Sequence, residues 1–263
     1  APIQATYIGY PNTTGVPTID YRLVDSLTDP AGAEAQAIEK LVRLDPCFLC
    51  YWPREDAPVP GPAPFLRSGH ITFGSFNSIK KLAPEVVGLW CRLLQEVPDS
   101  RLIIKSAGFN SESACRHFDE LFDKAGIAQD RVELRDRVDD KLDHLAAYDE
   151  IDIGLDTFPY NGTTTTCEAL WMGVPGVSLI GRLHAGRVGL SLLSAIGHPE
   201  LAAPTPDAYI AAAAGLARDT DRLAELHRTL RDQVRASPLC DAQAFARRFE
   251  STLRDLWRSF CKG

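Results

Sequence analysis

The central part of the chain alternates short apolar segments with longer amphipathic ones, and this alternation limits the possible folds more than any other feature. We predict strands and helices in turn at 70–75, 84–96, 101–105, 111–125, 131–134, 139–149, 151–155, 164–172, 175–180 and 186–196. Strands that alternate with helices form a parallel sheet with helices on both faces. The predicted strands are apolar throughout, as burial on both faces requires. The sequence therefore predicts an α/β fold whose ligands bind at the carboxyl ends of the strands.

The segments on either side are less regular. Before the alternation we predict strands at 3–9, 20–24, 41–44 and 48–51 and a short helix at 32–38. The stretch from Pro53 to Pro64 is rich in proline and is the best domain boundary in the sequence. After the alternation we predict helices at 206–218, 219–235 and 241–260. The last helix has an apolar stripe, which on the residues alone would pack on the flank of the sheet: Phe245, Phe249, Leu253, Leu256, Trp257 and Phe260.

The strand at 151–155 runs into a turn and then a helix that opens on a run of threonines. The turn formers and possible N-caps are Pro159, Asn161, Gly162, Thr163 and Thr164. The free backbone N–H groups of the helix would point out of such a turn, where they attract phosphate. Glu168, about one turn further on, can accept hydrogen bonds from ribose hydroxyls. A capped helix without a ligand has the same residues, and no G-x-G-x-x-G or Walker pattern is present, so both interpretations stay open.

Three other loops at the predicted carboxyl edge carry cations. The loop at 74–81 contains Asn77 and Lys81, and a lysine is a compact cation suited to a diphosphate, although a solvated lysine pair is the simpler interpretation. The loops at 135–144 and 181–187 supply Arg137, Lys141, His144, His184 and Arg187. No Asp-x-Asp pair follows a strand, so we expect no metal.

Composition and charge exclude two kinds of partner. Hydrophobic residues make up 45% of the chain, but the apolar runs are too short to cross a bilayer, so no membrane partner is expected. The 28 basic and 35 acidic residues give a net charge of −7 without a basic block, which argues against nucleic acid.

The cysteines and the N-terminus bear on the compartment. Seven scattered cysteines fit a reducing environment, and we interpret Cys47 and Cys50 as strand residues rather than as a metal or redox site. The chain begins Ala1-Pro2 without an initiator Met or a signal peptide. We therefore expect the C-terminal part of a longer, cytoplasmic protein.

Long motifs coincide with the loops described above. They are Gly9-Tyr-Pro-Asn-Thr-Thr-Gly15, Phe73-Gly-Ser-Phe-Asn77 with Lys81, Leu155-Asp-Thr-Phe-Pro-Tyr-Asn-Gly-Thr-Thr-Thr-Thr-Cys-Glu168 and Met172-Gly-Val-Pro175. Together they resemble the SPINDLY and O-linked N-acetylglucosamine transferase family of nucleocytoplasmic protein glycosyltransferases. The tail Phe260-Cys-Lys-Gly263 and the threonine run look more like the SPINDLY branch.

The resemblance implies a two-lobed glycosyltransferase B fold. Residues 1–55 would end the first catalytic lobe, 56–64 would be a proline-rich linker, 65–240 the Rossmann-like lobe that binds the nucleotide sugar, and 241–263 a helix that crosses back to the first lobe. The implied activity is inverting transfer of a sugar from UDP-N-acetylglucosamine or GDP-fucose to Ser or Thr hydroxyls of proteins, without a metal cofactor.

The resemblance also assigns roles to residues. It places the diphosphate at Lys81, Thr164 and Thr165, the ribose at Glu168 and the base near Lys141 and His144. The loop of Gly9, Tyr10 and Pro11 would approach the sugar, and Asn77, Asn161, Gly162 and Thr163 complete the donor site. Lys81 is the catalytic candidate because it would stabilise the leaving diphosphate.

The rest of the first lobe, with the family's acid/base candidates, and the tetratricopeptide repeats that bind the acceptor are expected upstream. This chain alone would then be incomplete as an enzyme. The alternative is a non-catalytic nucleotide-binding or scaffold fragment. A nicotinamide dehydrogenase is a weaker hypothesis because the glycine fingerprint is absent.

Overall fold

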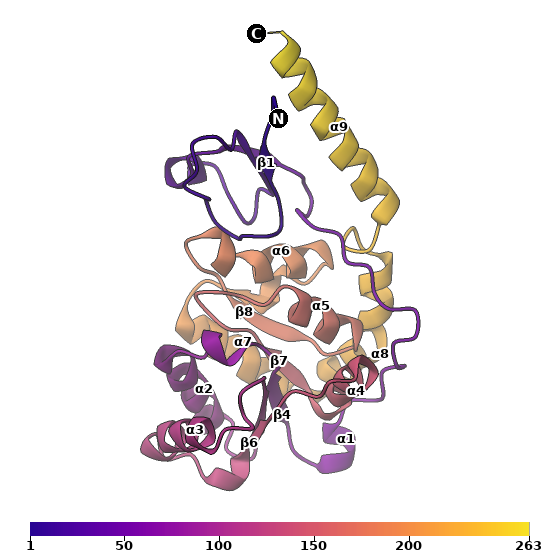
Figure 1. Ribbon diagram of the computed structural model, residues 1–263. Helices are drawn as coiled ribbons and strands as arrows, with labels where there is room; N and C mark the ends of the chain where they lie inside the picture. The colour runs from indigo at the N-terminus through magenta and orange to yellow at the C-terminus, as the bar shows by residue number, and fades with distance from the viewer. Residues whose placement is uncertain (263) are drawn as a thin grey trace.

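A six-stranded parallel sheet forms the centre of the computed structural model, which describes residues 1–262 (Figure 1). Its strand order is β6-β5-β4-β7-β8-β9. The strands are β4 Thr72–Ser75, β5 Arg101–Lys105, β6 Val132–Arg135, β7 Ile153–Leu155, β8 Gly176–Leu179 and β9 Ala202–Ala203. The chain builds β4, β5 and β6 outward and then returns to the other side of β4 for β7. The order therefore reverses between β4 and β7, where sheets of this kind bind ligands.

Helices cover the sheet because each connection between parallel strands crosses over one of its faces. The crossovers and the helices after them are α2 Pro84–Glu96, α3 Glu112–Lys124, α4 Lys141–Ala146, α5 Thr164–Trp171, α6 Val188–Ala195, α7 Pro206–Arg218 and α8 Thr220–Ala236. Helix α2 contacts both α3 and α7, whereas α5 contacts α6 and α8. No helix in residues 1–262 is long and apolar enough to cross a membrane.

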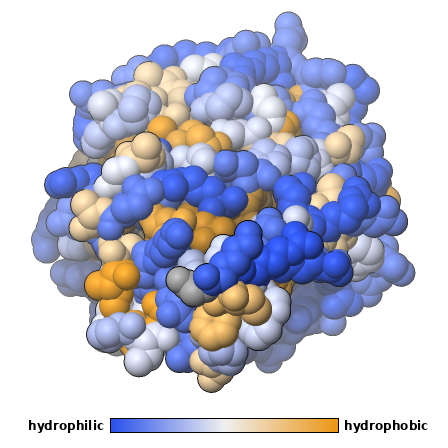
Figure 2. Space-filling model, turned by 90° about the horizontal axis from the view of Figure 1, so that it is seen from above, coloured by the Kyte–Doolittle hydropathy of each residue, from blue (hydrophilic) through white to orange (hydrophobic). Residues whose placement is uncertain are grey.

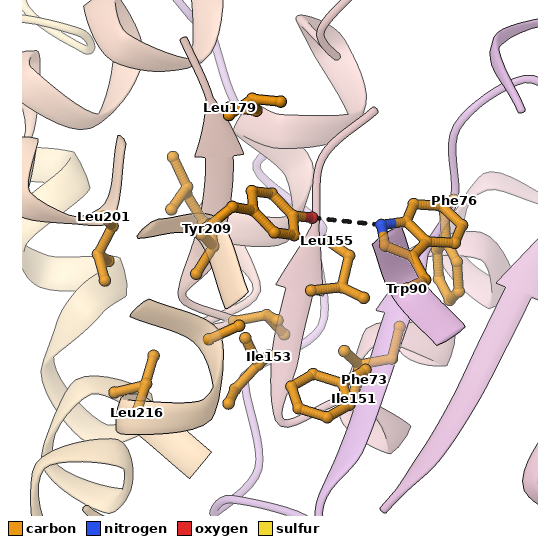
Figure 3. Packing of buried hydrophobic residues seen from close by; sticks show 14 of the residues in the cluster. Phe73, Phe76, Trp90, Ile151, Ile153, Leu155, Leu179, Leu201, Tyr209 and Leu216 are labelled. Carbon is orange, nitrogen blue, oxygen red and sulfur yellow. Dashed lines mark hydrogen bonds between the residues drawn. The ribbon is translucent and has the colours of Figure 1, made fainter. Parts of the chain in front are cut away.

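The core connects to the end of β7 through buried polar atoms. Trp90 of α2 donates from Nε1 to the Tyr209 hydroxyl of α7 over 3.3 Å, and both side chains are fully buried (Figure 3). The Tyr209 hydroxyl donates in turn to the carbonyl of Asp156 over 3.2 Å. A buried hydroxyl needs such partners, and here they fix the backbone where β7 enters its turn.

The N-terminal segment, residues 1–55, contains a second parallel sheet. Its strands are β1 Ala5–Thr6, β2 Tyr21–Val24 and β3 Lys40–Arg43. The buried carboxylate of Asp25 joins this segment to α6, because it accepts from Ser191 Oγ at 2.5 Å and from Phe48 N at 2.8 Å. The N-terminal segment is thus fastened to the larger sheet by specific hydrogen bonds.

Most of the predicted elements are confirmed within a few residues, but the strand at 48–51 is wrong. The backbone there bonds elsewhere: Phe48 N donates to Asp25, and Tyr51 N donates to the Leu239 carbonyl. Cys47 and Cys50 therefore lie in a loop, and all seven cysteines are free. The helix at 32–38 is a 3-10 turn, Ala33–Gln36, and the structure adds α1 Phe65–Ser68 and β9.

Helix α9, Ala242–Cys261, leaves the body of the molecule beside the N-terminal segment (Figure 1). Its Phe245 and Phe249 rings lie 6.4 and 5.4 Å from the Tyr7 ring, so the stripe begins on the N-terminal segment and not on the flank of the sheet. Leu253, Trp257 and Phe260 remain 41–51% exposed. Figure 2, a view onto this end, shows apolar surface framed by hydrophilic surface. The prediction that 241–263 crosses to a first lobe stays a prediction, and residue 263 lies outside the described residues.

Candidate functional site

Two loops leave the sheet next to each other at the point where the strand order reverses. The loop after β4 carries Lys81, and the loop after β7 carries Asn161. The Lys81 ammonium donates to the Asn161 carbonyl at 2.8 Å and lies 4.1 Å from the centre of the Tyr160 ring. Burial lowers the pKa of Lys81, and the charge of Asp156 counteracts this effect. The structure thus holds the predicted cation against the predicted turn.

Asp156 shapes that turn from inside. Its Oδ1 accepts from Gly162 N at 2.6 Å and Thr157 N at 2.9 Å, and its Oδ2 accepts from Ser178 Oγ at 2.8 Å. Burial raises the pKa of Asp156 to about 6, although these hydrogen bonds and Lys81 act in the opposite direction. Sequence reasoning missed this residue, and its only signal is an acidic residue directly after a buried strand.

Position 162 has no room for a side chain larger than that of glycine. A Cβ there would come within 2.6 Å of the Thr166 hydroxyl oxygen and 2.7 Å of that of Thr165. The buried Asn161 side chain supports the same backbone, because it donates to the Thr157 carbonyl at 2.9 Å and accepts from Gly189 N at 3.2 Å. The turn can therefore bring these hydroxyls close to its backbone.

Helix α5 begins without a side-chain cap. Thr163 occupies the N-cap position, but its side chain accepts no hydrogen bond from the first turn of the helix. The Thr165 hydroxyl donates instead to Asn77 Oδ1 at 3.3 Å, which joins the two loops. The interpretation of these threonines as caps alone therefore lacks the bond it requires at Thr163, and the N–H groups at the start of α5 are left for an anion.

A cavity of about 570 Å³ extends from this helix start. This volume is within the range of small-molecule sites, ≈ 300–1,000 Å³. It is lined by the predicted donor residues Lys141, His144, Thr164 and Glu168, by Arg137 and Phe76, and by residues that sequence reasoning missed: Tyr51, Trp52, Arg54, Lys105 and Ser106. His144 Nε2 lies 3.2 Å from Glu168 Oε2, so the predicted base and ribose residues meet.

The loop at residues 8–11 lies close to the turn. Tyr10 and Pro11 line a small hollow together with Tyr160 and Thr163, and Gly9 is exposed beside them. The residues directly after this loop are anchored by Glu39, whose carboxylate accepts from the Thr13 hydroxyl at 2.7 Å and from Thr14 N at 2.6 Å. Burial alone would raise the pKa of Glu39, but these bonds lower it to about 2.

Two residues of the 181–187 loop, His184 and Arg187, were predicted to lie at the carboxyl edge of the sheet, but they bind the N-terminal segment instead of lining the cavity. His184 Nδ1 lies 2.6 Å from Asp29 Oδ2, and Arg187 Nε donates to the Leu27 carbonyl at 2.7 Å. The loop at 181–187 therefore fastens the N-terminal segment to the sheet, and His184 borders the hollow beside the 8–11 loop. Within residues 1–262, no group of three or more His, Cys, Asp or Glu side chains is arranged to hold a metal ion.

Residues 65–249 match the sequence model of glycosyl transferase family 41. The chain belongs to this family. It is 47% identical over its full length to a Petunia hybrida protein named "Probable UDP-N-acetylglucosamine--peptide N-acetylglucosaminyltransferase SPINDLY" and 30% identical to the Arabidopsis thaliana SEC protein of the same activity name. It covers 28% and 27% of these two proteins, so it spans less than a third of their length.

Solved structures agree with the family 41 assignment. A mutant of the Thermobaculum terrenum O-GlcNAc transferase superposes with a TM-score of 0.93 at 37% identity, over 100% of this chain and 49% of that one. A pneumococcal O-GlcNAc transferase in complex with UDP and GlcNAc gives a TM-score of 0.55 at 15% identity, over 91% of this chain and 46% of that one, which shows the fold alone. The predicted α/β fold of the glycosyltransferase B class is confirmed. The division into lobes and the roles of single residues stay predictions.

Proposed function

We propose that this chain is the donor-binding part of a protein O-glycosyltransferase that inverts the sugar's configuration. The observation that carries the proposal is the Lys81 ammonium, which is held 2.8 Å from the Asn161 carbonyl beside the uncapped start of α5. A cation and a set of free N–H groups at a strand-order reversal suit a diphosphate.

The chemistry follows from where charge develops. When the sugar leaves, the diphosphate gains negative charge, and groups placed around it lower the barrier if they bind that state most strongly. In this proposal Lys81, the N–H groups at the start of α5 and the hydroxyls of Thr164 and Thr165 surround the diphosphate. In this proposal these groups meet the phosphate charge, so no metal cofactor is required.

The nucleoside would extend into the 570 Å³ cavity. Glu168 can accept bonds from the ribose hydroxyls, with His144 beside it to orient the carboxylate. Lys141 and His144 border the base, and the 8–11 loop approaches the sugar. The catalytic base, the tetratricopeptide repeats that hold the Ser or Thr acceptor, and a cytoplasmic location remain expectations for the whole protein.

The names of the relatives favour UDP-N-acetylglucosamine as the donor, and GDP-fucose is the alternative that a titration tests. We expect this chain to bind UDP or GDP with a clear preference, because a site that pairs the edge of one base leaves its polar groups unpaired with another. Calorimetry with both diphosphates measures the preference. Equal and weak binding of the two would contradict a dedicated donor site and support the scaffold alternative.

Replacing the threonines separates ligand binding from capping. We expect Thr164→Val and Thr165→Val each to weaken binding of the preferred diphosphate by about tenfold, because valine keeps the shape and removes a hydroxyl whose bond to a charged phosphate is worth roughly 1.5 kcal/mol. Thermal melts of the same proteins provide the control. A large drop in melting temperature with unchanged affinity would show that the hydroxyls serve the helix alone.

A further inference from the structure

Lys105 is a buried cation that the proposed function has not used. It ends β5 at the carboxyl edge, is 4% exposed and lines the donor cavity. Its ammonium donates to the His144 carbonyl at 3.2 Å and lies 4.0 Å from the centre of the Phe76 ring. Among residues 1–262, no carboxylate forms a salt bridge with it. A lysine has three N–H donors, and the described residues accept from one of them.

This environment is unfavourable for an ammonium unless a ligand completes it. Burial lowers the pKa of Lys105 to about 8, with help from the charge of Arg135, and against Glu168 and Glu150. A buried charge without a full set of acceptors is costly, and strongly perturbed groups that border a cavity are candidates for a function. The missing acceptor is expected to be an oxygen atom of whatever fills the cavity.

The position of Lys105 indicates which part of the donor it meets. In the proposed function, Lys81 binds the diphosphate at the turn, and Glu168 accepts hydrogen bonds from the ribose. Lys105 bonds to the carbonyl of His144, the residue that borders the base. On the proposed function, therefore, the Lys105 ammonium belongs to the base end of the cavity.

We propose that Lys105 selects the nucleobase by donating to a ring carbonyl oxygen, so that the site favours keto bases over amino bases. Uracil and guanine present a carbonyl oxygen where cytosine and adenine present an amino group, and an amino group cannot accept from an ammonium. The inference rests on the proposed function, but it specifies a chemical class of donor and a residue that reads it.

The test is calorimetry with two matched pairs of ligands, UDP with CDP and GDP with ADP, and with pyrophosphate as the reference. We expect the unchanged protein to bind the preferred keto diphosphate about ten- to hundredfold more tightly than its amino counterpart. Lys105→Met should lower the affinity for the keto ligand, bring the ratio close to one and leave pyrophosphate binding unchanged. Lys124→Met, at an exposed lysine of α3, is the matched control and should keep the ratio.

A second measurement does not depend on the folding of a variant. Burial lowers the pKa of Lys105 to about 8, so the ammonium loses its proton as the pH rises toward this value. The ratio of the affinities for the keto and the amino ligand should therefore fall in the unchanged protein between about pH 6.5 and about pH 8.5. The charges that act on Lys105 are those of Arg135, Glu168 and Glu150. The other charged or titratable side chains that line the same cavity are Tyr51, Arg54, Arg137, Asp139, Asp140, Lys141 and His144. The phosphate groups titrate alike in both ligands of a pair, so the ratio removes their contribution.

The outcomes are distinguishable. A ratio near one in the unchanged protein, or a ratio that Lys105→Met or pH does not change, with pyrophosphate still bound, would overturn the role of Lys105 alone. If neither pyrophosphate nor any of the four nucleotides binds, the proposed function fails, and this inference fails with it.

Discussion

Lys81→Met is expected to lower the affinity for the preferred nucleoside diphosphate about ten- to hundredfold and to leave the affinity for the nucleoside unchanged. A charge-assisted hydrogen bond contributes roughly 1.5–3 kcal/mol, and each 1.4 kcal/mol is a factor of ten in affinity. Methionine keeps the apolar stem of the side chain and removes the ammonium, and with it the charge, the hydrogen bond to the Asn161 carbonyl and the cation–π contact with the Tyr160 ring. Calorimetry with the two ligands measures the difference.

Lys80→Met is the matched control, because Lys80 is exposed and adjacent in sequence. It should bind both ligands as the unchanged protein does. Equal losses for diphosphate and nucleoside in Lys81→Met would rule out the diphosphate role. In the whole protein we expect transfer to fall further than binding, since the charge on the leaving diphosphate increases in the transition state.

The parallel sheet could be predicted from sequence because burial on both faces leaves an unmistakable pattern of short apolar runs. The threonine turn and Lys81 could be placed together because both follow strands, and the strand order β5-β4-β7 then brings their loops side by side. The uncapped state of Thr163 could not be predicted, since the same residue caps helices elsewhere through a bond that depends on backbone angles.

The errors have a common cause, which is that the decisive partner is distant in sequence. Phe48 and Leu49 look like a strand because they are apolar and buried, yet the Phe48 N–H is taken by Asp25. His184 resembled a ligand-binding residue until Asp29, 155 positions away, proved to be its partner. Lys105 was overlooked for the opposite reason, because a lysine at a strand end normally reaches solvent, and only the fold shows that this one is buried.

Asp156 illustrates how far the turn depends on one buried group. Three donors converge on its carboxylate: Gly162 N, Thr157 N and Ser178 Oγ. Two of them are backbone groups of the turn that presents α5 to the diphosphate. Removing the carboxylate therefore affects stability and binding together, and the two effects can be separated by the choice of substitution.

We expect Asp156→Ala to lower the free energy of unfolding by roughly 3–5 kcal/mol, because three buried donors lose their acceptor at about 1–3 kcal/mol each and part of this is recovered by removing a desolvated carboxylate. Diphosphate binding should fall with it. Asp156→Asn keeps an acceptor oxygen for the two N–H groups, so it should lose less stability. Asp255→Ala, at an exposed position of α9, is the control and should change neither quantity. Similar stability of the Ala variant and the unchanged protein would contradict this role.

The pH dependence provides an independent check. Because burial raises the folded-state pKa of Asp156 from 3.8 to about 6, the folded protein holds the proton more tightly than the unfolded chain. Its contribution to stability is therefore complete below about pH 4 and is lost as the pH rises to about 6, by at most roughly 3 kcal/mol. Asp152, with a pKa also raised to about 6, acts in the same range and the same direction. Denaturant unfolding should show a smaller decrease in the free energy of unfolding between these pH values for Asp156→Asn than for the unchanged protein. What remains is the difference between the decrease due to Asp152 and the increase due to carboxylates with a lowered pKa, such as Glu39. An identical decrease in both proteins would mean that Asp156 keeps an ordinary pKa in the fold, and that the hydrogen bonds of the turn offset its burial.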